Sequence, residues 1–170
     1  LLVNPVMIPR DHVLAGVHGA YNAVFVEAAN AGSLMFYGQG AGGHPTASAV
    51  LGDLVSAARA IALGAQGIPL ADHAGLPAVS MADVRTRLAV TLAVSDRLGV
   101  LARLAQVFAD HGVSISTMQQ SEDPRVTGTS MLRLVTHEGR HEDLMATVET
   151  LRGLDAVRDV VSVTPVETGE

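Results

Sequence analysis

The sequence predicts an α+β fold in two parts, on the strength of three observations. From residue 87 onward, strand-like runs and helix-like runs follow one another in the order βαββαβ. Before residue 64, two strand-like runs are followed by a glycine-rich loop and one long apolar helix. Between these parts, glycine and proline interrupt every periodicity. We therefore expect an N-terminal part over residues 1–75, a linker over 76–86 and a C-terminal domain over 87–166.

The N-terminal part begins with strand-like segments. Residues 1–8 are apolar but contain Pro5, which interrupts a strand. Residues 20–28 alternate between two faces, and residues 34–37 form a second apolar run. The four residues 30–33 between them, Asn-Ala-Gly-Ser, have the composition of a turn. We therefore expect these two runs to pair as an antiparallel hairpin.

A glycine-rich loop, residues 38–43, follows the hairpin and opens onto a long helix. Thr46 is a suitable N-cap, and residues 47–63 carry apolar side chains around most of the helical circumference. We therefore expect this helix to be buried on most sides. Asp53 would then be a buried carboxylate, bonded to nearby backbone groups or in contact with a ligand. Free N–H groups at the helix start suit an anionic or planar ligand.

The C-terminal part contains four predicted strands and two predicted helices. The strands are recognised by alternating or continuous apolar residues, at 87–94, 113–118, 129–136 and 157–163. The first helix runs from Val100 to a stop at Gly112, and the second is marked by Leu144 and Leu151. This order is typical of a ferredoxin-like sandwich, two helices over a four-stranded antiparallel sheet. A unit of about 80 residues buries only a modest share of its surface, so we expect it to pair with another copy.

The composition argues against several classes of partner and site. A net charge of −6 disfavours nucleic acid and anionic membrane surfaces as partners. Without cysteine there are no disulfides or thiolate zinc sites, and no apolar run approaches the roughly 20 residues that span a bilayer. We therefore expect a cytoplasmic protein. Because the chain starts in an apolar run without Met, we also expect it to be a C-terminal fragment.

Two short motifs resemble known functional patterns. Gly38-x-Gly40-x-x-Gly43 fits the dinucleotide-binding fingerprint, but no strand ending in an acid follows the helix. The favoured interpretation is a loop that touches a cofactor held elsewhere. His137-Glu138-x-x-His141 fits a zinc hydrolase pattern that requires one continuous helix, yet this stretch joins a strand to a helix and has Gly139 at its centre. We therefore expect a polar loop there, and no metal site or catalytic residue in the chain.

A tight strand-to-helix turn occupies residues 96–101, Asp-Arg-Leu-Gly-Val-Leu. Gly99 at its apex permits a sharp reversal that presents backbone N–H groups to a carboxylate. The spacing alone is equally compatible with a turn that has no ligand.

Both parts of the chain resemble one family. Three stretches carry the resemblance of the N-terminal part to the end of the catalytic domain of bacterial homoserine dehydrogenase, at residues 4–12, 21–27 and 35–53. The most specific of them is the run from the glycine loop to Asp53. The last 85 residues are similar to an ACT domain, the regulatory module that follows in these enzymes, and contain its D-R-x-G-V-L turn at residues 96–101.

The resemblance implies an enzyme that reduces aspartate semialdehyde to homoserine with NADPH or NADH, on the route to threonine, methionine and isoleucine. It places Gly40, Ala41 and Gly42 at the nicotinamide end of the cofactor. It also implies pairing of ACT domains in a homo-oligomer, with an amino-acid effector, L-threonine being the first candidate, near Asp96, Arg97, Gly99 and Val100, and with residues 113–116 nearby.

The chain departs from the family in two respects. It lacks the nucleotide-binding domain and has no lysine at all, whereas the family has a catalytic lysine, so we expect this chain to be inactive alone. Leu98 stands where proline is common in the ACT turn, and the loss of a fixed φ is expected to loosen the turn. The alternative hypothesis is a separate amino-acid sensor without catalysis, in which residues 1–75 only mediate dimerisation.

Overall fold

A computed structural model describes residues 3–65, 79–123 and 126–167. By their contacts, the residues divide into two units, one of residues 10–77 and the other of residues 1–9 together with 78–170. Residues 76–78 of the predicted linker lie outside the described part of the chain. No described helix is both long enough and apolar enough to cross a membrane.

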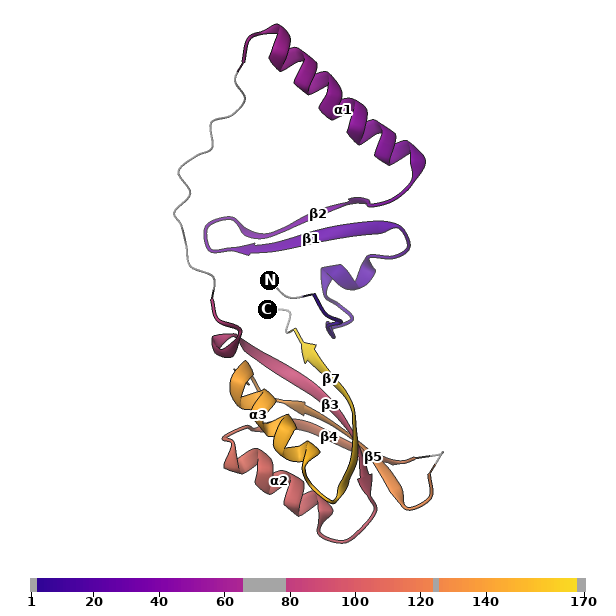
Figure 1. Ribbon diagram of the computed structural model, residues 1–170, viewed down its shortest axis with the longest axis vertical. Helices are drawn as coiled ribbons and strands as arrows, with labels where there is room; N and C mark the ends of the chain where they lie inside the picture. The colour runs from indigo at the N-terminus through magenta and orange to yellow at the C-terminus, as the bar shows by residue number, and fades with distance from the viewer. Residues whose placement is uncertain (1–2, 66–78, 124–125, 168–170) are drawn as a thin grey trace. The chain divides into compact units, whose positions relative to one another are not determined.

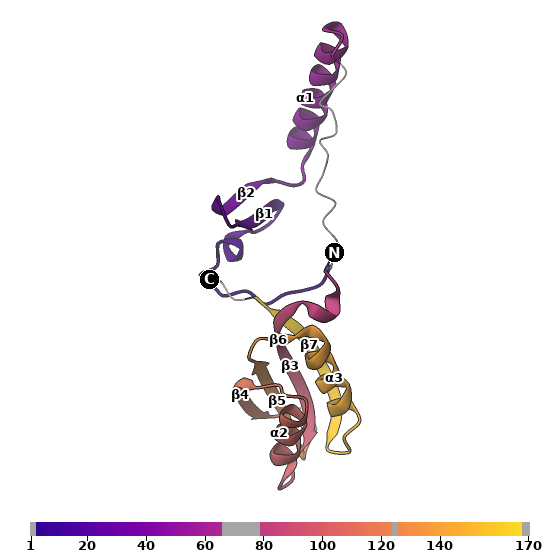
Figure 2. The same ribbon diagram turned by 90° about the vertical axis from the view of Figure 1, so that its left-hand side faces the viewer.

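The unit of residues 10–77 contains the predicted hairpin. Strand β1 (Tyr21–Ala28) pairs antiparallel with β2 (Gly32–Gln39) along its whole length, with Tyr21 opposite Gln39 (Figures 1 and 2). Gly32 takes a φ of 70° just after the turn, a conformation that suits glycine. A 3₁₀ turn, η1 (Val13–Gly16), precedes β1, and the ring of His12 accepts a hydrogen bond from the Leu14 N–H at its start.

Helix α1 (Gly43–Ala62) starts earlier than the sequence predicts. Its N-cap is Gly42, with a φ of 130°, and Thr46 lies within the first turns, where its N–H donates to the Gly42 carbonyl over 3.1 Å. Pro45 fits in the first turn because the N–H it lacks has no partner inside a helix at that position. The prediction of Thr46 as the cap was therefore wrong.

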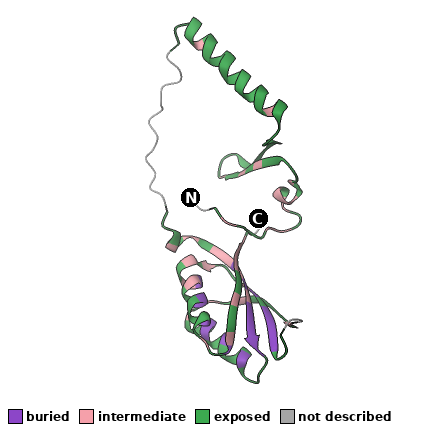
Figure 3. Cartoon of the chain, turned by 45° about the vertical axis from the view of Figure 1, so that its right-hand side comes forward, coloured by how far each residue is buried: buried purple, intermediate pink, exposed green. Residues whose placement is uncertain are grey.

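The prediction that α1 is buried on most sides was also wrong. None of its described residues is buried, and Val50, Leu54 and Ile61 expose 61%, 63% and 81% of their surface (Figure 3). The apolar pattern formed the helix, but burial needs a second surface, and no described residue of this unit provides one. Asp53 is likewise exposed rather than a buried carboxylate, and no backbone group is bonded to its side chain among the described residues.

The other unit confirms the predicted βαββαβ order. Its strands are β3 (Arg85–Ser95), β4 (Ile115–Glu122), β5 (Thr129–Thr136) and β7 (Val157–Val166), and its helices are α2 (Val100–Asp110) and α3 (His141–Arg152). The strands pair antiparallel in the order β4-β5-β3-β7, with the helices beside the sheet (Figure 1). A 3₁₀ turn, η2 (Met81–Asp83), precedes β3, and the two-residue strand β6 (Gly139–Arg140) pairs with the first residues of β3.

Strand β4 differs most from its predicted limits. It runs from Ile115 to Glu122, whereas the sequence predicts a strand over 113–118. The polar residues after Met118 continue the pairing with β5, as far as Glu122 opposite Ser130. Because β4 is an edge strand with both faces largely exposed, these residues need no apolar alternation.

One leucine-rich core holds this unit together. Leu88 and Leu92 of β3 meet Leu132 of β5, and α2 and α3 close the core with Leu104 and Leu144; each of these side chains is at most 1% exposed. The buried hydroxyl of Thr136 accepts the Leu88 N–H over 3.0 Å, so this polar group inside the core is satisfied. The described residues of this core all lie between Leu88 and Val163, within this unit.

Residues 3–9, which we call the strap, join the same unit. Met7 forms a parallel bridge with Val166: its N–H donates to the Pro165 carbonyl and its carbonyl accepts the Glu167 N–H, both over 2.9 Å. The expected strand over residues 1–8 is thus reduced, within the described residues, to one bridge at the end of β7.

Candidate effector turn and glycine loop

The turn between β3 and α2 has the sharp geometry that its sequence predicts. Gly99 takes φ 83° and ψ −6°, values that match the third residue of a type II turn over residues 97–100. The Val100 N–H closes this turn on the Arg97 carbonyl over 3.4 Å. Leu98 in place of proline therefore still permits the turn, and its side chain is fully exposed.

The start of α2 has free hydrogen-bond donors. Gly99 is its N-cap and offers no side chain to accept from the first turn. Among the described residues, the backbone N–H groups of Leu101 and Ala102 have no acceptor. Uncapped N–H groups at the positive end of a helix dipole are a binding site for an anion such as a carboxylate.

Two hollows flank this turn. One, of about 470 Å³, is lined by residues 94–102 together with Gln120. The other, of about 350 Å³, is lined by Ser95, by residues 97–100 and by three further residues, Arg103, Asp155 and Ala156. All four predicted effector residues, Asp96, Arg97, Gly99 and Val100, line the first hollow, and three of them line both.

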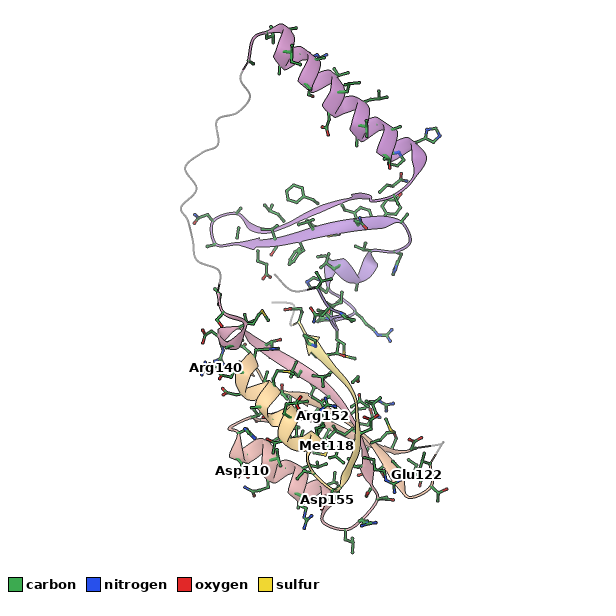
Figure 4. All side chains as sticks on the ribbon, viewed as in Figure 1. Asp110, Met118, Glu122, Arg140, Arg152 and Asp155 are labelled. Atoms are coloured by element: carbon green, nitrogen blue, oxygen red, sulfur yellow. The ribbon has the colours of Figure 1, made fainter. Side chains whose placement is uncertain are left out.

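The structure adds residues that the sequence did not predict for this site. Arg103 lies one helical turn after Gly99 on α2, Asp155 lies between α3 and β7 (Figure 4), and Gln120 lies on β4. Spacing along α2 could have suggested Arg103. Asp155 and Gln120 come to the turn only through the sheet order, so no local signal could have found them.

Residues 113–116, expected near the turn, are at the other end of the sheet. Ile115 lies opposite Thr136, whereas the turn lies beside the opposite end of β5, where the Asp96 N–H donates to the Gly128 carbonyl. Neither hollow is lined by residues 113–116. Within one chain, this part of the expected site is not brought to the turn.

The glycine loop before α1 is shaped by one close contact. The Gly40 N–H donates to the Ala20 carbonyl over 2.8 Å, and a Cβ at Gly40 would lie 1.9 Å from the side-chain nitrogen of Asn22. Only glycine fits there without displacing the Asn22 side chain. Gly40, Ala41 and Gly42 line a hollow of about 850 Å³ together with the first two turns of α1, including Val50 and Leu51. Its floor combines backbone groups with apolar side chains, which suits a planar ring.

The two histidines of the zinc-like motif are not on one helix. His137 follows β5, and its N–H donates to the Ser114 carbonyl, whereas α3 begins only at His141. Glu138 between them pairs with Arg85 at 2.6 Å. The described residues contain no group of three potential metal ligands. The stretch expected to be a polar loop contains the two-residue strand β6 before α3 begins, so the single continuous helix that the motif requires is not formed.

Comparisons with known proteins match both parts of the chain. The homoserine dehydrogenase family matches residues 1–55, and the ACT domain family matches residues 89–156. A homoserine dehydrogenase of Mycobacterium tuberculosis is 47% identical over 169 residues, and one of Corynebacterium glutamicum is 44% identical over 165 residues. Each alignment covers 97% of this chain but only 38% and 36%, respectively, of the relative, so the chain spans little more than a third of their length.

Solved structures agree with these relatives. A homoserine dehydrogenase from Thiobacillus denitrificans has a TM-score of 0.83 at 34% identity, over 96% of this chain and 38% of that one. A homoserine dehydrogenase from Staphylococcus aureus has a TM-score of 0.53 at 26% identity, over 94% of this chain and 36% of that one. The chain therefore belongs to the homoserine dehydrogenase family, as the counterpart of the C-terminal part of these proteins with its ACT domain.

Proposed function

We propose that this chain is the regulatory C-terminal part of an NAD(P)-dependent homoserine dehydrogenase, which reduces aspartate semialdehyde to homoserine in the cytoplasm. This reaction lies on the biosynthetic route to threonine, methionine and isoleucine. The observation that carries the proposal is the alignment of both matched families over the two structural units. The catalytic lysine and nucleotide-binding domain are supplied by the rest of the enzyme, so this chain alone is inactive.

The glycine loop serves the cofactor in this proposal. The reduced cofactor, NADPH or NADH, would supply the hydride when bound, and this chain would contribute the surface formed by Gly40, Ala41 and Gly42. The absence of side chains at Gly40 and Gly42 lets a ring approach the backbone closely. Among the described residues, the N–H groups of Gly43 and His44 at the start of α1 have no acceptor, and they are available to a polar group of the cofactor.

The turn between β3 and α2 is the proposed effector site. An α-amino acid carries a carboxylate and an ammonium group next to each other. The carboxylate would accept the free N–H groups of Leu101 and Ala102, assisted by the charge of Arg97, while Asp96 is available to the ammonium group. The hollows of about 470 and 350 Å³ leave room for a small side chain such as that of L-threonine.

Calorimetric titration of this chain with L-threonine tests the effector site, with methionine, isoleucine and lysine as comparisons. We expect saturable binding that is weakened at least about tenfold by Gly99→Ala, because alanine is strained at a φ of 83°. Gly112→Ala is the matched control: Gly112 has a φ of 67° at the other end of α2, has equal space around it and lines neither hollow. Equal loss in both variants would mean that the turn is not the site.

Homo-oligomers are part of the proposal. Strand β4 is an edge of the sheet, so one side of its backbone is available to pair with a second copy. Sedimentation velocity of the chain would show the dimer, and a monomer at all concentrations would contradict it.

The second candidate is a separate amino-acid sensor without catalysis. The observation in its favour is that the unit with the turn has a complete core of its own. The two candidates differ in the rest of the polypeptide: expression of the full reading frame should yield homoserine oxidation with NADP or NAD under the first and none under the second.

A further inference from the structure

The contacts of the strap, residues 3–9, and its family match assign it to different parts of the molecule. It lies within the segment that matches homoserine dehydrogenase, residues 1–55. Its contacts nevertheless group it with residues 78–170, the unit that contains the ACT match and that we call the ACT unit. The hydrogen bonds of the attachment join backbone groups: Met7 donates to the Pro165 carbonyl and accepts from the Glu167 N–H. Met7 and Val6 expose 53% and 40% of their surface, so the strap is held to the edge without being buried.

The strap sits at the far end of the strands that carry the effector turn. Strand β7 pairs with β3 from Val157 opposite Val94, next to the turn, to Val166 opposite Arg87. At the turn end, the Ser95 N–H also donates to the Ala156 carbonyl over 2.9 Å. Met7 bridges Val166, so the same pair of strands contacts the effector turn at one end and the strap at the other.

The attachment is weak enough for a ligand to change. Two hydrogen bonds at an exposed edge have a modest net value, well within the range of coupling between sites. Asn4 and Val6 of the strap line a hollow of about 280 Å³ together with Val84, Arg85 and His141. The pairing of β3 with β7 contains two register shifts, after Thr91 and after Ala93. A ligand that orders the β3–β7 pair next to the turn can therefore also strengthen the hydrogen bonding at the other end of this pair, beside the strap.

The strap continues directly into contacts that support the glycine loop. Five residues after Met7, His12 accepts from the Leu14 N–H over 3.1 Å, and its ring packs T-shaped against Phe25 on β1 with centroids 5.1 Å apart. Strand β1 pairs with β2, and Ala20 just before β1 binds the Gly40 N–H. Five residues span at most about 18 Å, so only a short segment of chain joins Met7 to His12.

We propose that residues 3–9 are a coupling strap: amino-acid binding at the turn tightens the pairing of Met7 with β7 and alters the support of the glycine loop through His12. The inference rests on the proposed function, because it requires the turn to bind an amino acid. It assigns a regulatory role to a segment outside both proposed sites.

Amide hydrogen exchange of the full 170-residue chain with and without L-threonine tests the strap. We expect threonine to slow exchange of the Met7 and Glu167 N–H groups at least about threefold, as expected when a marginal hydrogen-bonded pair is stabilised. The Gly40 N–H should respond as well. If threonine binds by calorimetry and the Met7 and Glu167 N–H groups do not respond, the strap proposal fails and the effector site stands. If threonine does not bind, the effector site fails and the strap proposal falls with it.

Two variants separate the strap from general effects on stability. Met7→Pro removes the donor to the Pro165 carbonyl, whereas Met7→Ala keeps both backbone hydrogen bonds and changes only an exposed side chain. In Met7→Pro we expect threonine affinity within about threefold of the original, with no response to threonine at the Glu167 and Gly40 N–H groups. In Met7→Ala both responses should persist. A response at Gly40 that survives Met7→Pro would overturn the proposal, and unchanged thermal unfolding of the ACT unit would show that it remains folded.

Discussion

Apolar side chains are buried in the ACT unit but exposed in the helix of the hairpin unit, although the two sequences are similarly apolar. In the ACT unit, leucines of β3, β5, α2 and α3 meet one another and are at most 1% exposed. In the unit of the hairpin, α1 carries Val50, Leu54 and Ile61 at comparable density and exposes each of them by more than 60%. The difference teaches that apolar periodicity determines whether a helix forms, whereas burial depends on a facing surface that the sequence of the helix does not contain.

The largest expected effect is on stability, and it compares one apolar-to-alanine substitution in each of the two units. Leu132→Ala removes a fully buried side chain and should lower the free energy of unfolding of the ACT unit by about 2–5 kcal/mol. Leu54→Ala, at a position 63% exposed in α1, should change the stability of this chain by less than about 0.5 kcal/mol. Urea unfolding followed by circular dichroism measures both. Similar losses in the two variants would mean that α1 is buried in solution.

A smaller effect is expected at the hydroxyl inside the core. Thr136→Val leaves the Leu88 N–H without its partner at 3.0 Å and should cost about 1–3 kcal/mol. Thr117→Val makes the same exchange on the exposed edge strand β4 and should have an effect near zero. Thermal unfolding of both variants, with exchange of the Leu88 N–H as the local measurement, checks this. A stable Thr136→Val chain would show that the N–H finds another acceptor.

The hairpin unit has its own sensitive position at Gly40. Gly40→Ala forces the side chain of Asn22 aside, and we expect faster exchange of the Gly40 N–H by roughly fivefold, about 1 kcal/mol. Gly38→Ala has free space around its Cβ and should leave that exchange unchanged. The double variant Asn22→Ala with Gly40→Ala should restore it. If the double variant exchanges as fast as Gly40→Ala, the loop is not shaped by this contact.

The smallest expected effect concerns the residue that differs from the usual ACT turn. Leu98 precedes Gly99 in a type II geometry, where proline is favoured, and its N–H has no acceptor among the described residues. Leu98→Pro should therefore raise the stability of the ACT unit by about 0.4–1 kcal/mol by restricting the unfolded chain. Threonine affinity should be retained. A loss of stability in this variant would show that the backbone at Leu98 is not compatible with proline.

Local sequence patterns predicted the helices and strands well in the ACT unit, where these elements pack against one another within the chain. The alternation from Leu88 to Val94 and the helical spacing from Val100 to Phe108 gave the βαββαβ order, which the structure confirms. The start of α1 was misplaced because Thr46 is a good capping residue, while the actual cap at Gly42 depends on a φ of 130° that composition does not reveal.

The site was predictable in its turn and not in its surroundings. Gly99 and its neighbours form a continuous motif, so the sequence could indicate them. Asp155 and Gln120 reach the same hollows from a loop and from an edge strand, which only the sheet order brings together. The contact of Met7 with Val166 joins residues at opposite ends of the chain, and no sequence pattern near either residue predicts it.

The pairing of Arg87 with Val166 has a practical consequence for engineering. Because the first strand and the last strand of the ACT unit end side by side, the unit enters and leaves at neighbouring points. A module of this kind can be inserted into a surface loop of a host protein without separating the ends of that loop. Residues 79–167 placed between the halves of a fluorescent reporter would therefore leave those halves next to each other.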